Sequence, residues 1–178
     1  MFRPPASNPA LKRSIRPIYA QHQATTYGGF LDPNWNRSFD IYPGTVMCRL
    51  TKEIFTPYTA TGNQKPFGLS AFFLAPQLGV DEVTATGTNL FTVWVGGEQA
   101  EFEILAPGFD STANWTSANV TDGGFQLLTG TNQGLLTPTG VNNGNSIATL
   151  IDVETTDKIL ITMNRYSLAT SVTAPAHA

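Results

Sequence analysis

Two groups of carboxylates are the side chains whose spacing is best suited to chemistry. Glu101 and Glu103 are two residues apart, so a β-strand at this position would place both on one face. Paired carboxylates serve as acid and base in glycoside hydrolysis. Asp152, Glu154 and Asp157 could bind Ca²⁺, but their spacing does not match an EF-hand loop. Carboxylates on solvated strand and turn faces explain both groups. We therefore expect no metal site, and catalysis is the least favoured of the hypotheses for this chain.

The histidines and the cysteine do not form a recognisable catalytic set. His22 and His177 lie near the two ends of the chain, away from any Ser, Cys or acid arranged as a triad. The single cysteine, Cys48, lies in an apolar run and is predicted to be a small buried side chain rather than a reactive thiol. The chain also lacks the glycine-rich loop followed by Lys and Ser or Thr that binds phosphates. We therefore expect a protein that is not an enzyme and has no cofactor.

Charge is distributed unevenly along the chain. Residues 1–31 hold four basic side chains and no acid, whereas ten acids and no Lys or Arg lie between Lys65 and Lys158. The basic side chains are Arg3, Lys12, Arg13 and Arg16. Four charges are sparse for binding a polyanion, and a chain with a net charge of −3 would repel one. We therefore expect no nucleic-acid partner.

The first 43 residues are predicted to form an extended N-terminal arm and loop. Prolines interrupt the stretch and disfavour a helix. Its apolar and aromatic content is too high for a purely solvated tail, which favours docking on another protein. In that interpretation the four basic side chains pair with acids of the partner, and aromatic side chains fill its pockets. The aromatic residues are Tyr27, Phe30, Trp35 and Phe39.

Residues 44–169 are predicted to form an all-β body. Short apolar or alternating segments with turn signals between them indicate strands at 45–50, 69–75 and 125–128, and an antiparallel pair at 147–153 and 158–163. This pattern is typical of a small antiparallel β-sandwich or barrel. Residues 170–178 are predicted to be a flexible tail.

A β-hairpin is predicted at residues 90–105. The strand 90–95 is followed by a Gly-Gly link and by the alternating strand 100–105. Phe102 and Ile104 would face the core, whereas Glu101 and Glu103 would lie on a solvated acidic face.

The overall composition is consistent with one domain and an arm. The chain has 178 residues, of which only 13% are charged, and its polarity comes mainly from Thr, Asn and Gly, which favour strands and turns. No apolar stretch approaches the roughly 20 residues needed to span a bilayer, so we expect no membrane partner. The single cysteine excludes a disulfide within the chain, so stability must come from packing or assembly.

A series of short segments resembles a known family. The segments are 40–47 (DIYPGTVM), 55–60 (FTPYTA), 67–71 (FGLSA), 79–83 (GVDEV), 91–94 (FTVW) and 100–110 (AEFEILAPGFD). In this order they resemble the head decoration, or capsid cement, proteins of tailed bacteriophages. The later segments are most similar to those of phages with actinobacterial hosts. The resemblance covers roughly residues 40–110.

The resemblance implies a structural protein of the virion that is made in the host cytoplasm. Such a protein binds the outer surface of the expanded head, contacts the major capsid protein and stabilises the shell by bridging its subunits. Members of the family often form homotrimers, and a dimer is the other state we consider. Arg3, Lys12, Arg13, Arg16 and the four aromatic residues would make the capsid contacts. The alternative hypothesis is a carbohydrate-binding β-sandwich on the virion, with Trp94 or Trp115 stacking on sugars.

Overall fold

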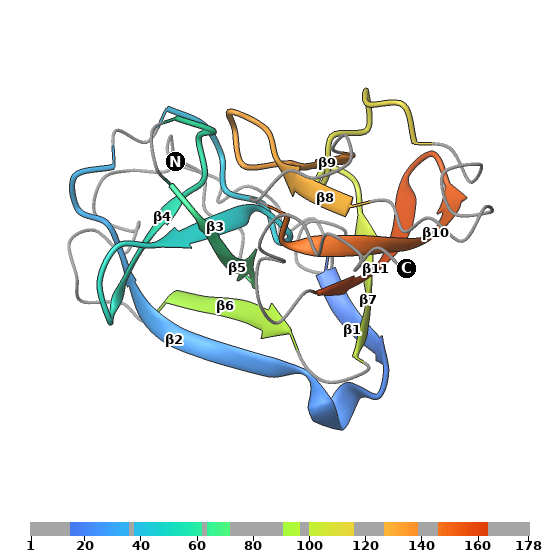
Figure 1. Cartoon of the computed structure of the whole chain (residues 1–178), viewed down its shortest axis with the longest axis horizontal. Coiled ribbons are helices and arrows are strands. Elements are labelled where there is room, and N and C mark those ends of the chain that lie inside the picture. Colours follow the sequence, from blue (N-terminus) through green and yellow to red (C-terminus); the bar gives the residue numbers. More distant parts are fainter. Residues whose placement is uncertain are drawn as a thin grey trace, which may run out of the picture.

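Two β-sheets make up the described part of the chain (Figure 1). The computed structural model describes residues 15–35, 38–61, 64–71, 91–96, 100–115, 127–138 and 146–163. A closed barrel and a six-stranded sheet account for all the strands in these ranges. The predicted all-β fold is confirmed. No helix in the described ranges is long and apolar enough to cross a membrane.

The barrel is formed by five strands in the order β2-β4-β3-β5-β6. Their bounds are β2 Thr25–Leu31, β3 Val46–Arg49, β4 Ile54–Pro57, β5 Pro66–Ser70 and β6 Phe91–Gly96. β2 and β4 pair in parallel, and the other neighbours are antiparallel. The strand predicted at 45–50 is therefore confirmed as β3, with bounds one residue shorter at each end.

The six-stranded sheet is antiparallel throughout, in the order β1-β7-β11-β10-β8-β9. Its strands are β1 Ile15–Tyr19, β7 Glu101–Leu105, β8 Leu127–Gly130, β9 Leu136–Pro138, β10 Ala148–Thr155 and β11 Lys158–Met163. The predicted antiparallel pair near the C-terminal end is confirmed as β10 and β11.

β3 separates two hydrophobic cores and contributes side chains to both. Successive side chains of a strand point to opposite faces. Val46 and Cys48 accordingly join the larger core, which also contains Phe102 and Ile104 of the sheet. Met47 joins a smaller core inside the barrel, together with the fully buried Phe55. The barrel and the sheet therefore share one continuous core, and the barrel has a second core of its own.

A glycine lets the sheet approach the start of β3 closely. The Val46 amide donates a hydrogen bond to the carbonyl of Gly134, in the β8–β9 connection, at 2.7 Å. Gly134 has φ +71°, and a Cβ at this position would lie 2.7 Å from the Thr45 Cγ2. Only glycine combines this backbone conformation with the required space.

The hairpin predicted at residues 90–105 is wrong. β6 lies in the barrel between β2 and β5, whereas β7 lies in the sheet between β1 and β11 (Figure 1). Two consecutive strands therefore belong to different sheets, because β6 pairs with β2 and β5 whereas β7 pairs with β1 and β11. Phe102 and Ile104 face the core as predicted, with 0% exposure.

The structure also corrects the predicted arm for residues 15–31. β1 pairs with β7 at an edge of the six-stranded sheet, and β2 is a barrel strand, where we expected a segment separate from the body. A 3₁₀ turn, η1 Gln21–Gln23, lies between the two strands and follows Ala20 at φ +45°. Residues 1–14 and the predicted tail at 170–178 lie outside the described residues.

Candidate functional site

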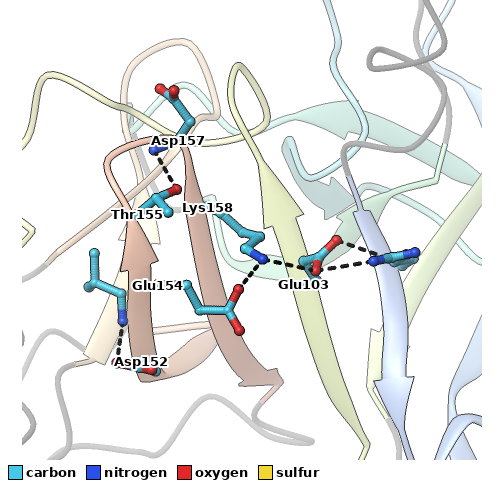
Figure 2. Close-up of polar contacts among 8 residues, drawn as sticks. Glu103, Asp152, Glu154, Thr155, Asp157 and Lys158 are labelled. Atoms are coloured by element: carbon cyan, nitrogen blue, oxygen red, sulfur yellow. Dashed lines mark hydrogen bonds and ion pairs between the residues drawn. The ribbon is translucent and has the colours of Figure 1, made fainter.

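A chain of charged side chains crosses one face of the six-stranded sheet. Glu103 accepts hydrogen bonds from Arg16 at 2.9 Å (Nε to Oε1) and 3.2 Å (Nη2 to Oε2) (Figure 2). Its Oε2 is also 3.7 Å from the Lys158 Nζ, which forms a second ion pair with Glu154. The four side chains come from β1, β7, β11 and β10, so the charges alternate in sign across four neighbouring strands.

The strand register places these side chains together. Arg16 lies directly opposite Glu103, and Lys158 lies opposite Leu105 on the other side of β7. Residues opposite each other on antiparallel strands have Cβ atoms only about 5 Å apart. The side chains of Arg16 and Lys158 flank the Glu103 carboxylate, whose side chain is only 9% exposed. The predicted solvated face is therefore wrong for Glu103.

The pKa shifts follow from the same contacts. The hydrogen bond from Arg16 to Glu103 and the charge of that carboxylate raise the pKa of Arg16. The hydrogen bond to Glu154 is the main cause that raises the pKa of Lys158, and the charges of Glu154 and Glu103 add to it. Both carboxylate oxygens of Glu103 face cations, so this side chain links β7 by ion pairs to its two neighbours, β1 and β11. We call this arrangement the electrostatic clamp.

A third cation, Arg49 at the end of β3, has no carboxylate partner among the described residues. Its guanidinium carbon lies 4.7 Å from the ring centre of Tyr27 and 5.2 Å from that of Phe67. The same group donates to the Tyr27 hydroxyl and to the carbonyls of Thr51 and Lys52, at 2.9–3.0 Å. The Tyr27 ring meets the rings of Phe55 and Phe67 edge to face. Arg49 thus stabilises the β3–β4 turn against the aromatic side of the barrel.

The predicted aromatic contact residues lie in or against the barrel. Trp35 is 9% exposed and belongs to the barrel core, and Phe39 packs edge to face on it with ring centres 5.5 Å apart. Tyr27 packs against the same core. Phe30 is half-buried on β2, opposite Ile54.

Only one of the four predicted basic contact residues lies in the described ranges. Arg16 is on β1, where it is paired with Glu103. Arg3, Lys12 and Arg13 lie outside the described residues. The basic and aromatic residues are therefore not brought together into one patch by the part of the chain that the structure describes.

The remaining candidates for chemistry are placed as follows. Cys48 is 2% exposed, as predicted, and burial raises the pKa of its thiol to about 12. His22 is exposed in the 3₁₀ turn, and His177 lies outside the described residues. In the described ranges no group of three His, Cys, Asp or Glu side chains could hold a metal ion.

Both tryptophans of the carbohydrate hypothesis are partly buried against the larger core. The Trp94 ring packs on Phe102 with ring centres 5.4 Å apart. The Trp115 ring packs on Phe109 at 5.2 Å, and its indole N–H donates to the Asp110 carbonyl at 2.6 Å.

The predicted contact residues do not include two exposed residues. Tyr19, at the end of β1, is 60% exposed, and Leu50, directly after β3, is 51% exposed; they are the large hydrophobic side chains exposed in the described ranges. The strand predicted at 45–50 includes Leu50, but the polar run Thr51-Lys52-Glu53 that follows it is a signal for a turn.

Comparisons with known proteins give one result. A family model described as a phage cement protein matches residues 1–178, which is the whole chain. No curated protein and no solved structure matches the chain. Cement proteins are structural components of the phage capsid, which agrees with the resemblance noted in the sequence and with a role outside catalysis. The chain belongs to the phage cement protein family.

Proposed function

We propose that the protein binds the outer surface of the expanded phage head and stabilises it by bridging subunits of the major capsid protein. The observation that carries this proposal is the match of the whole chain to the phage cement family. The all-β body supports it, because a cement protein must keep its shape while it links subunits. In this body an ion pair holds the edge strand β1, and the barrel and the sheet share one hydrophobic core.

The basic start of the chain is the proposed capsid grip. Arg16 is already paired with Glu103, so the grip is assigned to the residues before β1. Arg3, Lys12 and Arg13 would pair with acids on the capsid, because this segment has no acid of its own. Three of the aromatic residues first proposed as contacts pack in or against the barrel core, which leaves the half-buried Phe30 as the proposed aromatic contact.

Self-association strengthens such a grip. Several weak capsid contacts linked in one oligomer act at a high effective concentration, so avidity exceeds the affinity of a single contact. We propose a homotrimer, with a dimer as the alternative. The acidic β10–β11 turn, where Glu154 and Asp157 are exposed, would then face solvent.

A co-sedimentation experiment tests the proposal. A variant lacking residues 2–14 is compared with the full chain for binding to expanded, undecorated capsids. We expect at least a tenfold loss of affinity, and the triple substitution of Arg3, Lys12 and Arg13 by Ser should reproduce most of that loss. Lys65→Ser, which removes an exposed basic side chain of the body, is the matched control. Full-strength binding by the triple variant would contradict the grip.

A further inference from the structure

We propose that copies of this chain contact one another head to tail: the β3–β4 tip of one copy docks into the β1–β2 corner of the next. The β3–β4 tip is residues 50–53, and the β1–β2 corner is residues 18–23. The contact gives the self-association of the proposed function a specific surface, and it rests on that proposed function for its role on the capsid.

The β3–β4 tip presents an apolar side chain on a fixed backbone. Leu50 is 51% exposed, while its amide donates to the Ile54 carbonyl at 2.8 Å. Arg49 donates to the carbonyls of Thr51 and Lys52, and the Tyr27 hydroxyl donates to the latter at 3.1 Å. A loop that is already ordered loses little conformational entropy when it binds. The tip is therefore suited to insert Leu50 into a partner.

The β1–β2 corner offers a hollow of about 450 Å³, lined by residues 18–23. Tyr19, at 60% exposure, and the half-buried Ile18 supply its apolar wall. The Gln23 Oε1 is buried and has no hydrogen-bond partner among the described residues. A buried acceptor without a partner is unfavourable, and a donor from a docked chain would relieve it.

The charges around the two surfaces are complementary. The tip carries Lys52 and Glu53, which are both exposed. At the corner, Glu101 lies opposite Tyr19 on the neighbouring strand, and His22 is exposed in the 3₁₀ turn. None of the ion pairs in the described ranges uses Lys52 or Glu101. Lys52 of one copy can therefore pair with Glu101 of the next, and Glu53 can face His22.

The positions of the two surfaces explain why the contact needs a second copy. β2 begins at the corner and ends beside β4, whose start adjoins the tip (Figure 1). The Phe30 amide donates to the Glu53 carbonyl of the tip, so most of β2, a seven-residue strand of about 20 Å, separates the tip from the corner of its own chain. Because the two surfaces differ, the contact is heterologous, and it closes into a ring when the rotation between copies permits. A closed ring of three would be the proposed trimer.

Cross-linking between two cysteine variants tests the contact directly. Tyr19→Cys and Leu50→Cys are prepared separately in the full chain, mixed at high concentration and treated with a short bismaleimide. We expect a cross-linked dimer in the mixture and at least tenfold less in either variant alone. The double variant should give a ladder that stops at the closed ring. The native thiol of Cys48 will not compete, because it is buried with its pKa raised to about 12.

Two results would overturn the proposal. One is no mixed product, either in solution or on decorated particles; the other is a Leu50→Cys dimer as abundant as the mixed one, which would indicate a symmetric contact. Charge reversal is the second test: Lys52→Glu should weaken association at least fivefold, and adding Glu101→Lys should restore it. The capsid takes no part in the solution assays, so mixed cross-links without capsid binding would reject the proposed function and leave this contact standing.

Discussion

The barrel and the six-stranded sheet hold their arginines by different chemistry. In the barrel, Arg49 lies over the rings of Tyr27 and Phe67 and donates to neutral oxygens. In the sheet, Arg16 pairs with the Glu103 carboxylate, which also faces Lys158. Cation–π and carbonyl contacts depend little on salt, whereas exposed ion pairs are screened by it. The attachment of β1 should therefore respond to ionic strength, and the β3–β4 turn should not.

The comparison has a limit, because both sheets contribute to one core. Val46 and Cys48 of the barrel pack with Phe102 and Ile104 of the sheet. The two regions therefore differ in local attachment but are expected to unfold together.

The largest expected effect tests that shared core. Phe55→Ala in the barrel and Phe102→Ala in the sheet each remove a fully buried ring, so each should lower the free energy of unfolding by about 3–5 kcal/mol. Urea unfolding followed by circular dichroism and by tryptophan fluorescence should give one coincident transition in both variants. Separate transitions in either variant would show that the barrel and the sheet are independent units.

The next effect concerns the sheet alone. Glu103→Gln removes the charge that faces Arg16 and Lys158, and should lower the free energy of unfolding by about 1–2 kcal/mol at low salt, because solvent screens the two partly exposed cations. The difference from the wild-type protein should shrink in 1 M NaCl, because screening already weakens the ion pairs of the wild type. Glu53→Gln, at an exposed residue without an ion pair in the described ranges, is the matched control and should change little. Equal losses at both salt concentrations would contradict an electrostatic clamp.

Local patterns were sufficient to predict some elements but not their partners. The apolar run at β3 and the alternation of β10 and β11 are each visible within a few residues, and these strands were predicted correctly. The Gly-Gly link after β6 is a good turn signal, yet it joins two sheets, because pairing is decided by strands far away in the sequence.

The candidate site shows the same limit. Arg16 and Glu103 are 87 residues apart, so no local pattern predicts their pairing. Trp35 lies in a polar segment without strand periodicity, and its burial depends on the barrel that closes over it. The family resemblance, in contrast, is a property of the sequence itself and identified the functional class.

A smaller effect is expected in the barrel. Arg49→Lys keeps the charge but loses the planar group that lies over two rings and donates to three oxygens, so it should cost about 1 kcal/mol. The cost should be the same at low and high salt, unlike that of Glu103→Gln, and paired denaturation curves at the two ionic strengths will measure it. A cost that disappears in 1 M NaCl would show that Arg49, like Arg16, is held mainly by its charge. The barrel and the sheet would then not differ in how they hold their arginines.

The last prediction concerns the rate at which the Cys48 thiol is alkylated. This rate can be measured in the native protein without any substitution. With the pKa of its buried thiol raised to about 12, only about one molecule in 10⁴ carries a thiolate at pH 8, and alkylation requires the thiolate. Iodoacetamide should therefore label the native protein at least a hundredfold more slowly than the protein in urea. Because Cys48 lies where barrel and sheet meet, Phe55→Ala and Phe102→Ala should accelerate labelling by similar factors. Acceleration by Phe55→Ala alone would mean that the barrel opens while the sheet stays folded.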